Sequence, residues 1–257
     1  MMARSLKKKR SRRRSLWKLP IMLFLVIVLA FSGWQIWQHF AHERQVAAQF
    51  DELAQQINQP GNEEPEWTVH DQYRELFEQN SDMIGWIAID GTSINYPVMH
   101  TPERPNFYLN HNFEGRWCEF GVPYIFEYSS FDPHSDNITI FGHNMRNGSM
   151  FAALVGYEDE DFFREHPVIR FDTLAGFGEY EIIAAFFARP TVFEFHSFVD
   201  AVDRDEFEEF VRRIEEYSLY DTGITAEYGD RLLTLSTCVR GRSAYRFAVV
   251  ARKIQNV

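Results

Sequence analysis

Short apolar segments separated by turn-forming residues dominate the chain from residue 84 onward. Most of these segments are rich in Val, Ile, Phe and Tyr, and Gly, Asp, Asn or Pro residues stand at their ends, a pattern typical of β-strands. They predict eight strands, at residues 84–89, 93–98, 122–128, 138–141, 168–171, 180–187, 232–236 and 246–254. Eight short strands with few helices indicate a mainly β domain, built as a barrel or a sandwich.

Helical periodicity appears in three places. The strongest is residues 203–217, where four apolar residues form one stripe and the first turn is acidic, which suits the helix dipole. The stripe consists of Phe207, Phe210, Val211 and Ile214. Residues 41–58 also have apolar residues at helical spacing, and residues 71–79 predict a short helix. Residues 59–65 hold two prolines and a glycine, so we expect a helical stalk followed by a linker.

The N-terminal part of the chain has a different pattern. Residues 19–38 are 20 uncharged residues, which reach ~30 Å as a helix at ~1.5 Å per residue, about the thickness of a bilayer core. Residues 1–40 contain nine Lys or Arg and no acidic residue, which places the N-terminus in the cytoplasm by the positive-inside rule. Trp17, Trp34 and Trp37 suit the two membrane interfaces. We therefore expect a single-pass membrane protein whose main domain is extracellular.

A cleaved signal peptide is the alternative for this segment. The unbroken apolar run at residues 21–31 is short, and Ala30-Phe31-Ser32 is a small-x-small cleavage site. Under both interpretations, the domain that follows is exported. The predicted organisation is a basic cytoplasmic tail at 1–18, a transmembrane anchor at 19–40, a stalk and linker at 41–67, and one globular domain at 68–257.

The charge of the chain is unevenly distributed. The formal net charge is -11, but without the nine basic residues at the N-terminus the remaining chain has 17 Lys or Arg against 37 Asp or Glu, a formal charge of -20. A body this acidic repels a polyanion, so we expect no nucleic-acid partner.

Two cysteines are present, Cys118 and Cys238, fewer than a disulfide-stabilised exported domain normally has. They allow one bridge at most, and a buried, inert cysteine is the ordinary alternative for each. Cys238 differs because it ends an apolar strand-forming segment, where the loop 239–245 begins. Strand ends and loops are where rigid scaffolds present reactive groups, so Cys238 is the candidate nucleophile.

Two more residues with suitable chemistry stand at predicted strand ends. His143 follows the fourth predicted strand, and an imidazole beside a thiol can favour the thiolate and protonate a leaving amine. Arg246 opens the last strand. If that strand pairs as an antiparallel hairpin with the strand ending at Cys238, the guanidinium lies beside the thiol and can stabilise an oxyanion. Eight other histidines are possible proton-transfer groups besides His143. For Arg246, the alternative is an ordinary charged residue at a strand end. Arg240 and Arg242, in the loop, are expected to face water.

These residues lie in motifs that resemble the sortase signature. The motifs are Thr234-Leu235-Ser236-Thr237-Cys238, with Arg246 heading the next apolar strand, and Gly142-His143-Asn144-Met145. Their form is most similar to that of class B sortases. Further similar segments stand at residues 85–87, 95–98, 108–109, 150–151 and 166–167, so the resemblance covers roughly residues 70–255. The helix at 203–217 also lies where class B members are expected to have one.

The resemblance implies an eight-stranded closed sortase-type β-barrel with peripheral helices and a two-step acyl transfer without a cofactor. Cys238 would attack the threonine carbonyl in the C-terminal sorting motif of an exported protein. His143 would protonate the leaving amine and deprotonate the incoming one, and Arg246 would hold the oxyanion. The implied partners are exported proteins that bear the sorting motif and an amine acceptor, from a peptidoglycan precursor of the cell wall or from a pilin.

The resemblance also implies a peptide groove. Ser236 and Thr237 would line it near the nucleophile, and Phe141 would form an apolar wall where relatives often place Tyr. Asn106 is a further candidate, although its spacing to Leu109 is one residue shorter than the family pattern.

The chain departs from the family pattern in two places. Val239 and Arg240 follow the cysteine, where relatives can have an acidic residue, so a third, acidic catalytic residue there loses support. Residues 116–123 differ from the usual run of glycine and small apolar residues, and Cys118 within them matches no catalytic position, so we expect it to be structural. The acidic run at 158–161 lacks the glycine spacing of a calcium loop, which predicts a solvated turn and no metal site.

Two other functions remain as alternatives. In a cysteine hydrolase, water would resolve the same acyl-enzyme. In an inactive, membrane-anchored binding module, the barrel would have lost its chemistry, but the joint presence of Cys238, His143 and Arg246 argues against this.

Overall fold

The computed structural model describes residues 18–57, 69–173 and 176–255. The chain divides into two compact units, Met1–Ala48 and Gln49–Val257. The predicted linker at 59–65 and residues 1–17 of the predicted basic tail lie outside the described residues.

One helix accounts for the described part of the N-terminal unit. Helix α1 (Lys18–Gln55) runs without a break through the predicted span and most of the predicted stalk. Its segment Pro20–Gln55 contains a window that is long and apolar enough to cross a membrane, and none of that window is buried in the protein. A signal sequence has the same properties, so the helix is compatible with both an anchor and a signal peptide.

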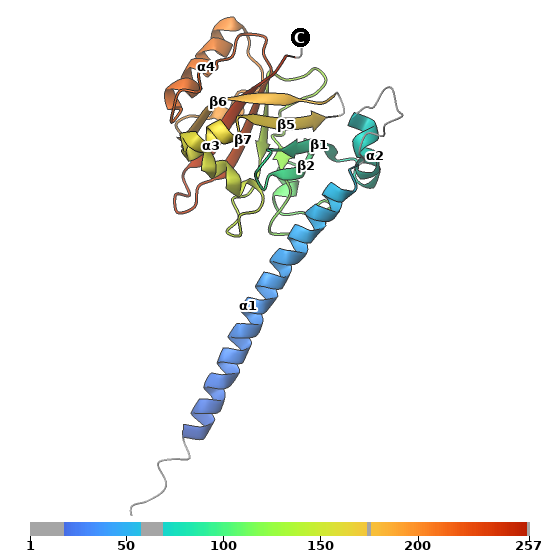
Figure 1. Cartoon of the computed structure of the whole chain (residues 1–257), viewed down its shortest axis with the longest axis vertical. Coiled ribbons are helices and arrows are strands. Elements are labelled where there is room, and N and C mark those ends of the chain that lie inside the picture. Colours follow the sequence, from blue (N-terminus) through green and yellow to red (C-terminus); the bar gives the residue numbers. More distant parts are fainter. Residues whose placement is uncertain (1–17, 58–68, 174–175, 256–257) are drawn as a thin grey trace, which may run out of the picture. The chain divides into compact units, whose positions relative to one another are not determined.

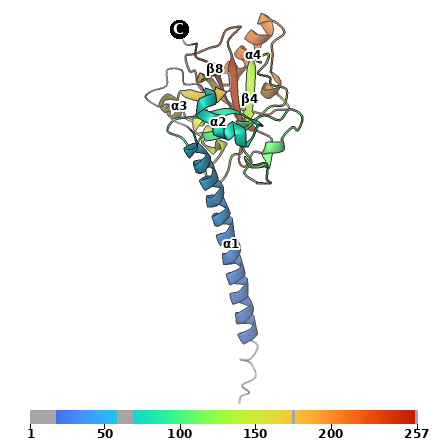
Figure 2. The same ribbon diagram turned by 90° about the vertical axis from the view of Figure 1, so that its right-hand side faces the viewer.

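A closed eight-stranded barrel forms the centre of the second unit (Figures 1 and 2). Its strands are β1 (Met83–Ala88), β2 (Asn95–Met99), β3 (Tyr124–Ile125), β4 (Asn137–Phe141), β5 (Val168–Thr173), β6 (Glu179–Ala188), β7 (Leu232–Cys238) and β8 (Arg246–Lys253). Around the barrel they run in the order β1-β2-β3-β4-β7-β8-β6-β5. The pairs β2–β3 and β4–β7 are parallel, and the other neighbours are antiparallel. Both the closed barrel and the existence of each predicted strand are confirmed.

The barrel is held by aliphatic side chains that these strands bury. Ile87, Ile140, Leu233, Leu235 and Val249 are all fully buried. Burying an aliphatic side chain of this size contributes roughly 1.5–3 kcal/mol relative to leaving it in water. A closed barrel also leaves no unpaired strand edge. The strand ends are therefore presented from a rigid frame.

Helix α4 (Arg204–Tyr217) covers part of the outer face of the barrel next to β6 (Figure 1). The predicted apolar stripe is buried in one cluster with Ile183 and Phe186 of β6. The helix begins where the side chain of Asp203 accepts a hydrogen bond of 3.0 Å from the backbone N–H of Glu206, an N-cap that satisfies one free donor of the first turn. The predicted helix is confirmed, as is the short helix α2 (Val69–Gln79).

Two local predictions were wrong. The strand predicted at 122–128 shrinks to Tyr124–Ile125 because the Val122 N–H bonds the carbonyl of Tyr108, which lies outside the barrel strands, at 3.0 Å. The acidic run at 158–161, predicted as a turn, instead joins a 3-10 helix that ends at Glu158 to the start of helix α3 (Glu160–Glu165), where Asp159 accepts from the Asp161 N–H at 2.9 Å. Acidic residues suit a helix N-terminus as well as they suit a turn.

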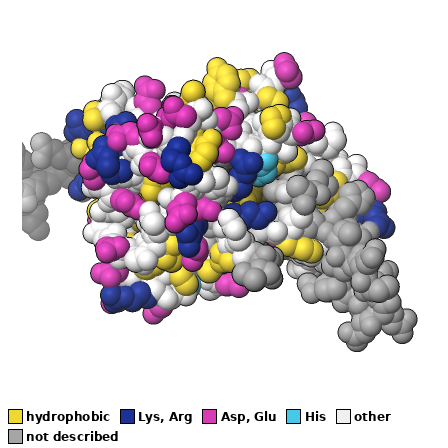
Figure 3. Space-filling model, turned by 90° about the horizontal axis from the view of Figure 1, so that it is seen from above, with side chains coloured by type: hydrophobic (Ala, Val, Ile, Leu, Met, Phe, Trp, Pro, Cys, Tyr) yellow, Lys and Arg dark blue, Asp and Glu magenta, His cyan; other side chains and the backbone are white. Residues whose placement is uncertain are grey.

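Three short 3-10 helices complete the described elements. They are η2 (Phe107–Leu109), η3 (Phe151–Glu158) and η4 (Phe195–Ser197). Figure 3 shows acidic and basic side chains mixed on one face of the molecule. The described residues on that face therefore form no large patch of one charge.

Candidate active site

Strands β7 and β8 bring a thiol and a guanidinium together at one end of the barrel. Cys238 and Arg246 are Cα partners in the antiparallel register, and Arg246 is also the partner of Ala188 on β6. Residues directly opposite each other in such a ladder project from the same face of the sheet. The predicted pairing of these two strands is thus confirmed. Cys238 is exposed and Arg246 is half-buried.

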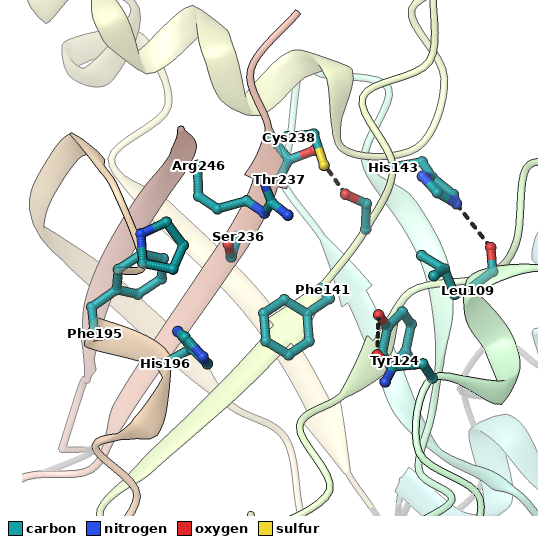
Figure 4. A pocket seen from close by; sticks show the side chains of 13 residues that line it. Leu109, Tyr124, Phe141, His143, Phe195, His196, Ser236, Thr237, Cys238 and Arg246 are labelled. Atoms are coloured by element: carbon teal, nitrogen blue, oxygen red, sulfur yellow. Dashed lines mark hydrogen bonds between the residues drawn. The ribbon is translucent and has the colours of Figure 1, made fainter. Parts of the chain in front are cut away.

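The loop between these strands is a compact hairpin connection. The Arg242 N–H donates to the Val239 carbonyl at 3.1 Å, and the Tyr245 N–H donates to the Arg242 carbonyl at 2.8 Å. The guanidinium of Arg246 donates through Nη1 to the carbonyls of Ser243 and Tyr245, at 3.3 and 3.2 Å. Both contacts are made by Nη1, so the other nitrogens of the guanidinium remain available at the cavity that Arg246 lines (Figure 4).

The parallel pairing of β4 with β7 brings His143 to the same end of the barrel. Phe141 is the Cα partner of Ser236, so the residues that follow both strands leave the sheet side by side. The Gly142 N–H donates to the Ser236 carbonyl at 3.1 Å, and the Thr237 hydroxyl donates to the Gly142 carbonyl at 2.7 Å. One step further, the Asn144 side-chain amide donates to the Cys238 carbonyl at 3.0 Å. Three hydrogen bonds thus hold the histidine loop against the cysteine strand.

Gly142 in this loop has a steric requirement. A Cβ atom at this position would lie 2.5 Å from Cγ of Phe151, well inside van der Waals contact. Because Phe151 is fully buried, its ring has no room to give way. Glycine therefore lets the histidine loop pack closely on η3.

The imidazole of His143 is oriented by a backbone carbonyl. Its Nε2 lies 2.8 Å from the carbonyl oxygen of Leu109, and because a carbonyl only accepts, Nε2 must have a proton. The second ring nitrogen, Nδ1, is then the one that can exchange a proton with a reacting group. Figure 4 shows this nitrogen on the side of the ring toward Cys238.

A cavity of about 420 Å³ connects these side chains. All seven predicted site residues line it, together with six other residues. The full set is Asn106, Leu109, Tyr124, Phe141, Gly142, His143, Pro190, Phe195, His196, Ser236, Thr237, Cys238 and Arg246. The fold therefore gathers the predicted nucleophile, proton-transfer group, oxyanion partner and groove residues around one cavity (Figure 4).

The groove residues have different environments. Ser236 is 1% exposed, and its Oγ has no hydrogen-bond partner among the described residues, so it can bond to a ligand in the cavity. Thr237 is also buried, but its hydroxyl already donates to Gly142. Phe141 packs edge-on against Phe126, with ring centroids 6.0 Å apart. These contacts give the cavity an apolar wall with one unused hydroxyl.

Five lining residues were missed by the sequence-based prediction: Leu109, Tyr124, Pro190, Phe195 and His196. Burial raises the pKa of Tyr124 to about 12. Burial lowers the pKa of His196; Glu194 opposes this shift, whereas the nearby positive charge of Arg246 adds to it. Tyr124 lies on β3, Pro190 lies in a turn, and the other three lie on the short 3-10 helices η2 and η4. Their place at the cavity depends on tertiary packing, and the sequence pattern gave none of them a role in the site.

The second cysteine lies away from this chemistry. Cys118 is 4% exposed and unpaired, as expected for a structural residue. Among the described residues, no group of His, Cys, Asp and Glu side chains is placed to hold a metal ion.

Comparisons with known proteins agree with this geometry. No family model matches the chain. Sortase B of Listeria monocytogenes is 30% identical over 221 residues, covering 85% of this chain and 88% of that protein. The Staphylococcus aureus sortase B–substrate complex superposes with a TM-score of 0.76 at 26% identity, covering 84% of this chain and all of that one. Sortase B from Bacillus anthracis in complex with AAEK1 gives a TM-score of 0.73 at 26% identity, with coverage of 84% and 100%. The chain belongs to the class B sortases and is a sortase-type cysteine transpeptidase.

Proposed function

We propose that this protein cleaves the C-terminal sorting motif of exported proteins after its threonine and transfers the acyl group to an amine of the cell wall or of a pilin. The observation that supports this most is the register pairing of Cys238 with Arg246 at a cavity that His143 also lines. A thiol, an imidazole and an oxyanion donor at one cavity are the groups that acyl transfer through a thioester requires.

In the first step, the Cys238 thiolate attacks the threonine carbonyl carbon, and the carbonyl π electrons move to oxygen. The Arg246 guanidinium stabilises that negative oxygen. When the tetrahedral intermediate collapses, the peptide C–N bond breaks and protonated His143 gives its proton to the leaving amine. The products are a thioester on Cys238 and the released C-terminal segment.

In the second step, the acceptor amine attacks the thioester carbon and His143 takes a proton from its nitrogen. The C–S bond then breaks and the thiolate of Cys238 is regenerated. The hydrogen bond from Nε2 to the Leu109 carbonyl supports this role, because it leaves Nδ1 as the site of proton exchange. The imidazole is protonated in one step and neutral in the next, so one residue serves both steps.

The acyl half of the substrate is expected to lie in the cavity between these steps. Phe141 would contact apolar parts of the peptide, Ser236 would supply a hydroxyl that has no other partner among the described residues, and Asn106 would supply an amide. Thr237 would act chiefly by holding the Gly142 carbonyl.

We also propose that α1 anchors the protein in the cell membrane with the N-terminus in the cytoplasm and the barrel extracellular. The apolar window within Pro20–Gln55 and the nine basic residues before it support this arrangement. A membrane-bound enzyme on the outer side would meet exported substrates as they emerge, and peptidoglycan precursors or pilins would be the available acceptors.

Hydrolysis is the alternative outcome of the same acyl-enzyme, and triglycine separates the two reactions. A transpeptidase should convert peptide into its triglycine amide in preference to the free acid, in proportion to triglycine concentration. Product that stays entirely the free acid would indicate a hydrolase. If the protein cleaves no peptide of a library with one fixed threonine and randomised neighbours, it would be an inactive binding module.

A further inference from the structure

Asn106 has an unusual backbone conformation at the edge of the cavity. It is one of two non-glycine residues with positive φ among the described residues, at φ 60° and ψ 15°. It stands at the N-cap of η2, yet its side chain makes no capping hydrogen bond, although asparagine is a preferred capping residue. A left-handed residue persists when its surroundings hold it, and such residues cluster at functional sites. The side chain is thus free to bond to a partner other than the helix.

Tyr124 is the residue that engages it. The Tyr124 hydroxyl donates a hydrogen bond of 2.9 Å to Oδ1 of Asn106. Tyr124 is itself fixed, because it is 7% exposed and is the Cα partner of Phe141, with the two ring centroids 5.6 Å apart. Burial raises the pKa of this phenol to about 12, so the hydroxyl keeps its proton at physiological pH and stays a donor.

The free end of the Asn106 carboxamide is consequently its amino group. Oδ1 is occupied by Tyr124, whereas Nδ2 has two N–H donors. Asn106 and Tyr124 both line the cavity that contains Cys238. A donor here matches the carbonyl oxygen that every peptide unit presents.

We infer that Tyr124 is a positioning residue that presents the Asn106 amide as a hydrogen-bond donor to a carbonyl oxygen on the acyl side of the bound sorting peptide. This rests on the proposed function. The acyl side is the half that must remain bound while the leaving segment departs and the amine enters at the exposed Cys238. The contact is made in both the ground state and the transition state, so its loss raises KM and leaves kcat nearly unchanged.

A purely structural role for Tyr124 would produce a different result. The Asn106 carbonyl accepts from the Leu109 N–H at 3.1 Å, and the Leu109 carbonyl accepts from His143 at 2.8 Å. If Tyr124 served only to keep η2 in place, its removal would disturb the partner of His143. That disturbance would move the pH profile of kcat/KM, which reports the ionisations of the free enzyme.

The test uses the full-length protein in detergent and a fluorogenic peptide library with one fixed threonine and randomised neighbours. The peptide that the unaltered protein cleaves fastest serves as substrate at saturating triglycine. Asn106→Ala should raise KM roughly two- to tenfold, as expected for one neutral hydrogen bond, with kcat within about twofold. Asn106→Asp should raise KM further, because it replaces the donor with an acceptor. Tyr124→Phe should raise KM by less than Asn106→Ala does.

The double variant Tyr124→Phe/Asn106→Ala distinguishes the outcomes. Its KM should equal that of Asn106→Ala, since Tyr124 acts through Asn106, and all variants should keep the same pH profile. Additive effects, a fall in kcat at unchanged KM, or a shifted pH profile in Tyr124→Phe would overturn the inference. A normal KM in Asn106→Ala would do so while leaving the proposed function intact. If the unaltered protein cleaves no library peptide, both fail.

Discussion

Replacement of Arg246 by alanine should lower turnover far more than it changes substrate affinity. Among the described residues, the Arg246 side chain makes two hydrogen bonds, both to backbone carbonyls, at 3.3 and 3.2 Å, so its loss disturbs the fold little. The negative oxygen that it stabilises develops only after Cys238 attacks. Removing one oxyanion donor costs about 100- to 1,000-fold in turnover, or roughly 2.7–4 kcal/mol of transition-state stabilisation. We therefore expect kcat to fall by that factor, with KM within about threefold.

Arg246→Lys tests whether geometry or charge matters. An ammonium group is a point charge and does not reproduce the planar fork of a guanidinium, so lysine should restore little of the lost turnover. Arg240→Ala and Arg242→Ala are matched controls, because both residues are exposed in the same hairpin and neither lines the cavity. The assay is steady-state cleavage of a fluorogenic peptide with triglycine as acceptor. Near-normal turnover in Arg246→Ala, or an equal defect in either control, would refute the assignment.

Three further predictions follow from other parts of the chain. Cys238→Ala should abolish cleavage while Cys118→Ala keeps most of it, and the reverse pattern would reassign the nucleophile. Protease added outside intact cells should digest residues 60–257 of a membrane-bound protein, whereas a soluble species that begins near Gly33 would indicate signal cleavage. Burial holds the pKa of His100 below its usual 6.5, so the unfolded chain takes up the proton first and unfolding should become easier as the pH falls below about 6.5. His100→Asn should reduce that acid-dependent drop in melting temperature, and an unchanged drop would contradict the linkage.

Local sequence patterns sufficed for much of the site. The hairpin that pairs Cys238 with Arg246 is short in sequence, so its register follows from where the two apolar runs end. The apolar stripe of α4 is equally local, and it predicts both the helix and its buried face. These features depend on contacts between neighbours in the chain, which periodicity reports directly.

Other features depend on contacts that no local pattern encodes. The parallel pairing of β4 with β7 joins residues about 95 positions apart, as in the bond from Thr237 to Gly142. The sequence analysis did not predict this pairing. Strand β3 is short because the N–H of Val122, just before it, bonds to Tyr108 outside the barrel strands, and His196 reaches the cavity from the short 3-10 helix η4. The left-handed Asn106 likewise has no signature in the sequence, because asparagine is common in turns of every kind.

Direct detection of the acyl-enzyme tests the central claim best. The full-length protein, mixed with a cleavable threonine-containing peptide and quenched in acid, should gain the mass of the acyl fragment, and peptide mapping should place it on Cys238. Added triglycine should remove that mass and release the triglycine amide in equal amount. Modification of Cys118 instead, or cleavage with no covalent intermediate and no amide product, would contradict a thioester-based transpeptidase.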